Sequence, residues 1–477
     1  MMQMGDVPIV QVTGAIVVLC SLLWLLLTGN KAPQGVPPGS FGWPLIGESI
    51  EFLRWRRKIS TFALFKEKRK KYGNIFKTHL FFSPTVVITG ADAHKLLQND
   101  GYRSLTSGHS SAMKDLFGQS LILADGDQHK QMRKAIMAGI NSKVLKNQIP
   151  ILEELTIQTL NSWEGNEISA SEEFAKFTFY SILGLLISMK PSPQAEHLRD
   201  YFSVYAKDGI SLPLKIPGTA YNRALQARKK LVDEITKIMD QRRKDNRLHE
   251  DVLAHFMHTQ DLPENDSRLS DDEIIDNMLF FIFSGFETTS TALSRIIQLL
   301  ADHPHELKLV QAEQKCIQEE IGNNAPLTWE KLKSMPYTSM VISEALRLSH
   351  LGTEISFRTA KTDIAFEGYT IPRGWNIIVD RASTDINPEI FKEPHKFNPS
   401  RFKENVPPYV FMPFGGGVRS CPGMEFANLE IMIFIYHLVN NYSWHLTKPY
   451  DGLEYTGIVP KPKSGVPIFV ERLRQEH

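Results

Sequence analysis

An uncharged apolar segment lies near the start of the chain. Residues 7–27 contain no Asp, Glu, Lys or Arg, and this length is close to the roughly 20 residues that a helix needs to cross a bilayer. A cleaved signal peptide is the alternative, but its apolar region is shorter and follows basic residues, whereas the only charged side chain here is Asp6. The pattern predicts a retained membrane helix, with residues 1–30 as an anchor and 31–477 as the body.

Basic residues follow this segment. Between residues 54 and 71, nine Lys or Arg stand against one acid, Glu67. The positive-inside rule then predicts that the body faces the cytosol, although a solvated helix face would show the same charges. Between anchor and basic stretch, the proline-rich residues 31–44 predict a semi-rigid, extended hinge.

The longest predicted helix crosses the body. Ser270 followed by Glu273 has the capping-box pattern of a helix start, and apolar residues continue to Leu300, before Pro304. About 30 residues span roughly 45 Å, the width of a domain, so this helix is expected to run through the core. The residues at its centre that do not suit a purely structural helix are Gly285, Glu287, Thr288 and Thr289.

Shorter elements surround this helix. Alternating apolar residues predict strands around 85–89 and 364–371, and helical spacing predicts helices over 337–348 and 424–438. No Gly/Ser tract or repeat divides the chain after the hinge. Although the length would suit about three average domains, we therefore expect one domain, mainly α with small β-sheets.

Composition narrows the function. The 54 basic and 53 acidic residues give a net charge of +1, so no overall field favours nucleic acid. The three cysteines, Cys20, Cys316 and Cys421, are too few and too scattered for a disulfide framework, and suit a reducing compartment. A cysteine with chemistry would act as a single thiolate.

The clearest chemical signal surrounds Cys421. The stretch Phe-Gly-Gly-Gly-Val-Arg-Ser-Cys-Pro-Gly matches the pattern of a haem-thiolate loop, with Phe414, Gly415, Arg419 and Gly423 at specified positions. A cysteine that binds haem iron must be a thiolate, and peptide N–H groups directed at sulfur shield it. Glycines permit such a turn, and the dipole of the following helix points to the sulfur. A zinc site would need further ligands nearby, which are absent from the sequence; an inert buried cysteine is the other alternative.

With this loop the chain resembles the cytochrome P450 superfamily, from the hinge to the C-terminus. The resemblance implies the P450 fold, with haem b held between the central helix and the cysteine loop. It implies a monooxygenase that uses O2 and receives NADPH-derived electrons from NADPH–cytochrome P450 reductase. It also implies a single-pass protein of the endoplasmic reticulum membrane, in contact with lipid, with a cytosolic catalytic domain.

Glu344 and Arg347 resemble the Glu-x-x-Arg pair of the family. The same spacing occurs at residues 51/54, 196/199 and 471/474, so only its position ahead of the cysteine loop selects this pair. On a helix, the i, i+3 spacing places both side chains on one face. The resemblance implies that they hold Arg401 in a structural triad.

The stretch Ser284-Gly-Phe-Glu-Thr-Thr289 resembles the family's central-helix motif, with serine in place of a small apolar residue. In that motif Glu287 and Thr288 would supply protons for oxygen activation. A Thr288 hydroxyl bonded only to its own helix is the alternative. Family members that rearrange peroxides tend to lose this acid–alcohol pair, so its presence favours oxygenation.

Partners for the haem propionates are implied by three further matches. Residues 126–133 look like the helix over the propionates, where His129 replaces a common Trp and Arg133 is the expected partner. Arg419 and Arg358 are further candidates, because guanidinium groups pair with carboxylates. A solvated His129 is the alternative. The family's Pro-Pro step before Phe357 is absent, which leaves the shape of that loop open.

The substrate class follows mainly from resemblance. The hinge sequence, Asn387-Pro-Glu and Pro413-Phe-Gly-Gly-Gly-Val-Arg resemble a plant clan that oxidises steroid hormones, triterpenoids such as amyrin, and diterpenoids such as taxanes. A polycyclic diterpenoid or triterpenoid, oxidised once or in successive steps to aldehyde or acid, is the predicted substrate. A hydrophobic molecule needs an apolar pocket, although such residues are more often plain core. The candidate pocket residues are Phe280, Phe281, Leu351, Ile355, Ile458 and Val459.

Three alternatives remain at this point. One is a steroid-hormone-type hydroxylase of the same clan. Another is a haem-thiolate isomerase or dehydratase, which would need no reductase. The last is a haem protein that only binds a ligand or transfers electrons.

Overall fold

The computed structural model describes residues 33–474, apart from 44–45, 59–60, 109–110, 210, 212, 246–248, 263–266, 323–324, 353–356 and 455–458. The predicted membrane helix at 7–27 lies outside these residues. Within the described ranges, no helix combines the length and apolarity needed to span a bilayer.

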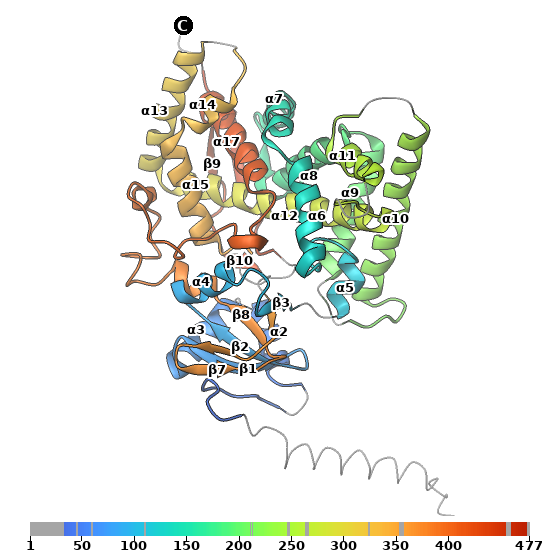
Figure 1. The fold of residues 1–477 in the computed structure, drawn as a ribbon. Helices are drawn as coiled ribbons and strands as arrows, with labels where there is room; N and C mark the ends of the chain where they lie inside the picture. The colour runs from blue at the N-terminus through green and yellow to red at the C-terminus, as the bar shows by residue number, and fades with distance from the viewer. Residues whose placement is uncertain are drawn as a thin grey trace, which may run out of the picture.

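Helices form most of the body; one group of strands lies together at one end, and other strands lie beside the helices (Figure 1). The helices are α2 (Ser49–Lys58), α3 (Thr61–Tyr72), α4 (Ala91–Asn99), α5 (Ser111–Phe117), α6 (Gly126–Gly139), α7 (Ser142–Trp163), α8 (Ala170–Ile187), α9 (Pro193–Gly209), α10 (Ala220–Lys244), α11 (Val252–His258), α12 (Asp271–Asp302), α13 (Pro304–Ile321), α14 (Trp329–Lys333), α15 (Pro336–Ser349), α16 (Arg381–Asp385) and α17 (Met424–Asn441). Three short 3₁₀ turns are η1 (Thr259–Asp261), η2 (Pro399–Phe402) and η3 (Gly417–Arg419).

The strands form small sheets. They are β1 (Ile75–Leu80), β2 (Ser83–Ile88), β3 (Leu105–Ser107), β4 (Glu167–Ser169), β5 (Phe357–Ala360), β6 (Ile364–Phe366), β7 (Tyr369–Ile371), β8 (Asn376–Val379), β9 (Tyr442–Leu446), β10 (Leu453–Glu454), β11 (Lys461–Pro462) and β12 (Pro467–Arg472). The largest sheet has the order β1-β2-β8-β5-β3, in which β2 and β8 are parallel. A second has the order β4-β12-β9, and two hairpins pair β6 with β7 and β10 with β11. The predicted class, mainly α with small sheets, is confirmed.

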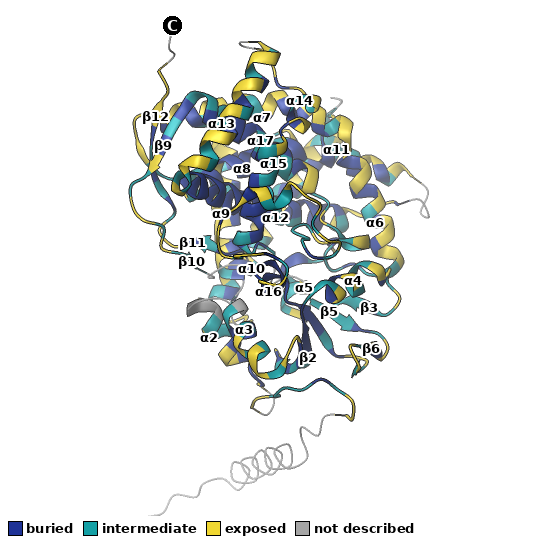
Figure 2. Cartoon of the chain, turned by 90° about the vertical axis from the view of Figure 1, so that its left-hand side faces the viewer, coloured by how far each residue is buried: buried dark blue, intermediate teal, exposed yellow. Residues whose placement is uncertain are grey.

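The central helix α12 begins as the sequence predicts. The Ser270 hydroxyl accepts the Glu273 N–H at 3.2 Å, and the Glu273 carboxylate accepts the Ser270 N–H at 3.0 Å. The capping box is therefore confirmed. Figure 2 shows buried residues concentrated on α8, α12 and α17, and Phe281, Phe283 and Phe286 of α12 are in the main core cluster. A helix that is apolar on most sides lies inside the protein.

Two local predictions needed correction. The predicted strand at 364–371 is a hairpin of β6 and β7, because Glu367 and Gly368 have positive φ angles of 46° and 79° and turn the chain back. The predicted hinge is attached to the body over its described part. Lys77 N–H donates to the Pro38 carbonyl, and Thr370 N–H donates to the Gly35 carbonyl, each at 2.8 Å.

Candidate functional site

The Cys421 loop joins η3 to the start of α17 and is closed by its own backbone. The Cys421 N–H donates to the Phe414 carbonyl at 2.8 Å. Gly415 and Gly417 have φ angles of +67° and +63°, a conformation that glycine adopts without strain. At Gly417 a Cβ atom would also lie 2.4 Å from the Gln98 carbonyl oxygen of α4, so the loop can approach α4 only with glycine there.

Cys421 lines a cavity and is exposed to it. Burial raises the pKa of the Cys421 thiol. The N–H groups of Gly423 and Met424 and the charge of Arg133 oppose this rise, because each of them favours the thiolate. The loop therefore supplies donors to the sulfur, as its sequence predicts.

The cavity lies between α12 and the Cys421 loop. Phe280, Phe281 and Thr288 line it from α12, and Phe414, Gly415 and Gly423 line it from the loop. Further apolar lining comes from distant parts of the chain. These residues are Leu121, Ile122, Ile182, Leu185, Leu186 and Leu346.

Basic side chains gather along one part of this cavity. Arg133 donates to the carbonyl and hydroxyl of Ser420, each at 2.8 Å. Arg419 donates to the Ala124 carbonyl at 2.7 Å and to the Asp125 carboxylate at 2.9 Å. The basic and imidazole side chains that line the cavity are His94, His129, Arg133, Arg358, Arg381 and Arg419.

The charges of these side chains change the pKa values of their neighbours. Burial and the neighbouring charge of Arg419 lower the pKa of Arg358 to about 10. Burial and the charges of Arg419 and Arg133 lower the pKa of His129 to about 3. His129 is 2 % exposed and its Nδ1 forms a hydrogen bond with the Tyr102 hydroxyl, so it is not a solvated side chain. A region with this density of cations attracts carboxylates.

On α12, the predicted acid–alcohol pair points in two directions. Thr288 lines the cavity, and its hydroxyl donates to the Ser284 carbonyl at 2.7 Å. Glu287 is not among the described residues that line the cavity. Its carboxylate is 6 % exposed and pairs with Lys461 of β11 at 2.8 Å. The bond within the helix, considered above as an alternative for Thr288, is thus present.

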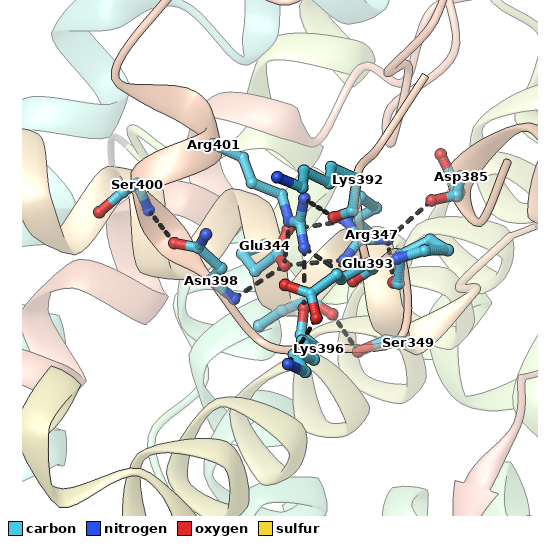
Figure 3. A network of polar contacts seen from close by, with 12 residues as sticks. Glu344, Arg347, Ser349, Asp385, Lys392, Glu393, Lys396, Asn398, Ser400 and Arg401 are labelled. Atoms are coloured by element: carbon cyan, nitrogen blue, oxygen red, sulfur yellow. Dashed lines mark hydrogen bonds and ion pairs between the residues drawn. The ribbon is translucent and has the colours of Figure 1, made fainter. Parts of the chain in front are cut away.

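Glu344 and Arg347 of α15 meet Arg401 of η2 in a network of polar contacts (Figure 3). Two nitrogens of Arg347, Nε and Nη2, donate to the Glu344 carboxylate at 2.7 Å, and Arg401 Nε donates to it at 3.1 Å. Glu344 and Arg347 are both fully buried. Arg347 also donates to the carbonyls of Asp385 and Pro394, each at 2.7 Å. The charges are therefore fully hydrogen-bonded, which a buried ion pair requires.

Comparison with known proteins decides the family. Residues 37–468 match the family model described as cytochrome P450. The chain belongs to the cytochrome P450 family.

The similar proteins cover nearly the whole chain. Abscisic acid 8'-hydroxylase 1 of Arabidopsis thaliana is 34 % identical over 93 % of this chain and 92 % of that protein. A cholesterol 16,22-dihydroxylase of Paris polyphylla is 33 % identical over 93 % of each chain. The structure of retinoic acid-bound cyanobacterial CYP120A1 matches with a TM-score of 0.82 and 30 % identity, covering 92 % of this chain and 99 % of that one.

As a cytochrome P450, the protein is a monooxygenase that uses haem b with a cysteine thiolate ligand, O2 and NADPH-derived electrons. The residues of the cavity fit this cofactor. A cysteine sulfur with N–H groups directed at it suits the iron, and the cluster of guanidinium groups suits the propionates. The relatives named hydroxylases do not support the alternative of a haem protein that only binds a ligand or transfers electrons.

Among the predicted pocket residues, Phe280, Phe281 and Leu351 line the cavity of this P450. Val459 is buried in the core cluster that also contains Leu351, Ile468 and Val470, and it is not among the described residues that line the cavity. A role for Val459 in the substrate pocket therefore stays a prediction, because an apolar side chain near the site can face either the core or the cavity. Ile355 and Ile458 lie outside the described residues.

Sequence reasoning missed Tyr102, His94 and Arg381 of this P450, all of which line the cavity. Arg381 follows β8 and donates to the Met412 and Pro413 carbonyls at 3.2 and 2.9 Å, next to the Cys421 loop. No short sequence motif marks these residues. His94 lies on α4, Tyr102 follows α4 and Arg381 follows β8, so their meeting at the cavity depends on how these elements pack against the loop.

Proposed function

We propose that this cytochrome P450 hydroxylates a polycyclic terpenoid, of diterpene or triterpene size, at a haem bound by Cys421. The observation that supports the proposal most directly is that the cysteine, the threonine and an apolar lining belong to one cavity. Cys421 and Thr288 line it together with apolar side chains from α6, α8 and α12 or the segments beside them. Apart from the group of basic side chains described above, the lining is mainly apolar, which suits a large hydrocarbon skeleton.

The named molecules of the relatives point to the same broad class. Abscisic acid, cholesterol and retinoic acid, which appear in the names of the similar proteins, are all isoprenoids. They support a terpenoid-like substrate and give no particular support to amyrin or taxane skeletons. The cholesterol-oxidising relative favours a steroid-type substrate as the second candidate.

The cofactor supplies the iron at which dioxygen is activated. In our proposal the Cys421 thiolate is the iron ligand, and the Gly423 and Met424 N–H groups stabilise its charge. Arg133, Arg358, Arg419 and His129 hold the propionates.

Protons must reach the cavity for oxygen to be reduced. We assign Thr288 to hold a proton at its hydroxyl, because this hydroxyl belongs to a cavity-lining residue. We assign Glu287 to supply protons from the direction of Lys461, whose ammonium group pairs with it and whose side chain is 41 % exposed. The carboxylate must turn from Lys461 toward the cavity to pass a proton to Thr288.

The electron donor in this proposal is NADPH–cytochrome P450 reductase, docking on the face nearest Cys421. Arg133 and Arg419 are basic residues close to Cys421, but they are bound to Ser420 and Asp125 beside the cavity. They are unsuited to a surface contact. The exposed lysines on α6 and at the start of α7 fit an acidic partner better; these are Lys130, Lys134, Lys143 and Lys146.

We place the protein on the endoplasmic reticulum membrane, held by the segment at residues 7–27. Exposed apolar side chains near the start of the described chain support contact with lipid. Trp43 is 80 % exposed, Ile50 is 66 % exposed and Phe82 is 76 % exposed. Phe81, next to Phe82, packs its ring 5.6 Å from Phe52 of α2, so these residues lie on one side of the body.

A binding panel tests the substrate class. A substrate that displaces the water on ferric haem shifts the Soret band, so diterpenoids, triterpenoids, sterols, abscisic acid, fatty acids and phenylpropanoids can be compared at equal concentration. We expect polycyclic terpenoids to give the shift, and co-expression with a reductase to give a hydroxylated product that requires NADPH. A shift with fatty acids or phenylpropanoids alone would overturn the substrate class and leave the haem-thiolate site standing.

A further inference from the structure

Tyr102 and His129 form an unusual contact at the edge of the cavity. Tyr102 lies between α4 and β3, and its φ of +73° is rare for an aromatic residue. Its hydroxyl forms a hydrogen bond with Nδ1 of His129 on α6, and the two ring centroids are 5.3 Å apart. The Lys361 ammonium group donates to the Tyr102 carbonyl at 3.2 Å, which helps to hold this backbone conformation.

The surroundings keep His129 neutral. It is buried, and Arg419 and Arg133 add positive charge nearby, so its pKa falls to about 3. A neutral imidazole has one N–H and one lone pair, and the partner of one nitrogen decides where the proton lies.

The surroundings also decide which group donates in this contact. Burial raises the pKa of the Tyr102 hydroxyl, so it keeps its proton near neutral pH. The Tyr102 ring has the Arg419 guanidinium 5.8 Å and the Lys130 ammonium 5.5 Å from its centroid. These cations can only donate. The Tyr102 hydroxyl therefore donates its hydrogen to the lone pair of His129 Nδ1.

We propose that Tyr102 is a positioning residue that fixes His129 as the Nε2–H tautomer and directs this neutral donor to the cavity. The acceptor would be a carboxylate of the cofactor, so the inference rests on the proposed haem site. His129 lines the cavity, and Nε2 is the ring nitrogen that Tyr102 leaves available. The residue then offers a fixed N–H on the side of the ring away from Tyr102.

A double-mutant cycle tests this role without turnover. The variants are Tyr102→Phe, His129→Trp and their combination, and the measurement is the rate of haem transfer from the ferric holoprotein to excess apomyoglobin. An indole carries its N–H permanently and needs no partner to place it. We expect Tyr102→Phe to speed haem loss about three- to tenfold in the wild-type background, the size of one hydrogen bond, and to have no effect in the His129→Trp background.

Two controls keep the test decisive. Tyr201→Phe removes a hydroxyl from another tyrosine whose ring faces a lysine, Lys230 at 4.9 Å, and should leave haem loss unchanged. If His129→Trp does not fold, His129→Gln serves as the second background, because an amide N–H is also permanent. Equal acceleration by Tyr102→Phe in both backgrounds, or none in the wild type, would overturn the tautomer role.

The ferrous–CO spectrum separates this inference from the proposed function. Absence of a thiolate-ligated haem in the wild-type protein would overturn the haem site itself. Normal thiolate spectra in all variants, with equal rates of haem loss, would overturn only the role of Tyr102.

Discussion

Glu287 of α12 and Lys461 of β11 form an ion pair, with Lys461 Nζ 2.8 Å from Oε2 and 2.9 Å from Oε1. Although Glu287 belongs to the family's acid–alcohol motif, this pairing turns its carboxylate away from the residues that line the cavity. The pair connects the centre of the protein to a surface hairpin. The proton supply that we propose through Glu287 therefore depends on where β11 holds Lys461.

Lys461→Met tests the importance of this pair for stability. The substitution leaves the buried Glu287 carboxylate without its cation, and we expect a loss of about 1–3 kcal/mol in the free energy of unfolding. Lys463→Met, an exposed lysine two residues away, should cost little. Denaturant unfolding of both variants gives the comparison. Equal stability of the two variants would show that the ion pair contributes nothing.

Thr288→Ala tests the hydroxyl in the cavity. Haem and substrate should still bind, while product formed per NADPH should drop by at least about tenfold, because proton delivery is lost. Thr291→Ala is the matched control, since Thr291 also donates to its own helix, at the Glu287 carbonyl, but does not line the cavity. If both variants keep normal coupling, the Thr288 hydroxyl serves only its helix.

The Glu344 triad offers a comparison within the chain. Glu344→Gln leaves the fully buried Arg347 without its anion, and we expect a loss of about 3–5 kcal/mol in stability, as for other broken buried pairs. Glu471→Gln changes the same Glu-x-x-Arg spacing at an exposed position and should cost under about 0.5 kcal/mol. Thermal unfolding with haem bound measures both. Similar melting temperatures would contradict a structural role for the triad.

Glu430 on α17 predicts a dependence of stability on pH. Burial raises its pKa to about 8, and its Oε1 has no hydrogen-bond partner among the described residues. The folded protein therefore keeps this proton between its ordinary pKa of 4.5 and about 8, where the unfolded chain releases it. Stability should then fall with rising pH across this interval, by about 1.4 kcal/mol per pH unit from this group.

Glu430→Gln removes that titration. Its melting temperature relative to wild type should rise steadily from pH 5 to pH 8, because the variant has no buried proton to lose. Glu425→Gln, an exposed position on the same helix, should stay parallel to wild type. Parallel curves for Glu430→Gln as well would mean that this carboxyl titrates normally in the folded protein.

Much of the site could be predicted from sequence because its signals are local. The Cys421 loop and the capping box at Ser270 each lie within about ten residues, where backbone geometry dictates residue type. The contact of Glu344 with Arg347 also follows from helical spacing. In these cases one stretch of chain contains both partners.

The remaining features depend on segments far apart in the sequence. Lys461 meets Glu287 across 174 residues, and Arg133 meets Ser420 across 287. Tyr102 reaches His129 from a loop with no recognisable motif. Val459 illustrates a second difficulty, since apolar character alone does not reveal whether a side chain faces the cavity or the core. Such relationships arise from packing, which periodicity does not encode.

The most direct test of the account is the ligand of the iron. Cys421→Ala and Cys316→Ala should be purified with haem, reduced and exposed to CO; Cys316 lies exposed on α13, away from the cavity lining. Thiolate ligation shifts the Soret band of the ferrous–CO complex far to the red, because sulfur donates electron density to the iron. We predict that wild type and Cys316→Ala show this band and that Cys421→Ala loses it or loses haem. A thiolate band retained in Cys421→Ala would contradict the central assignment.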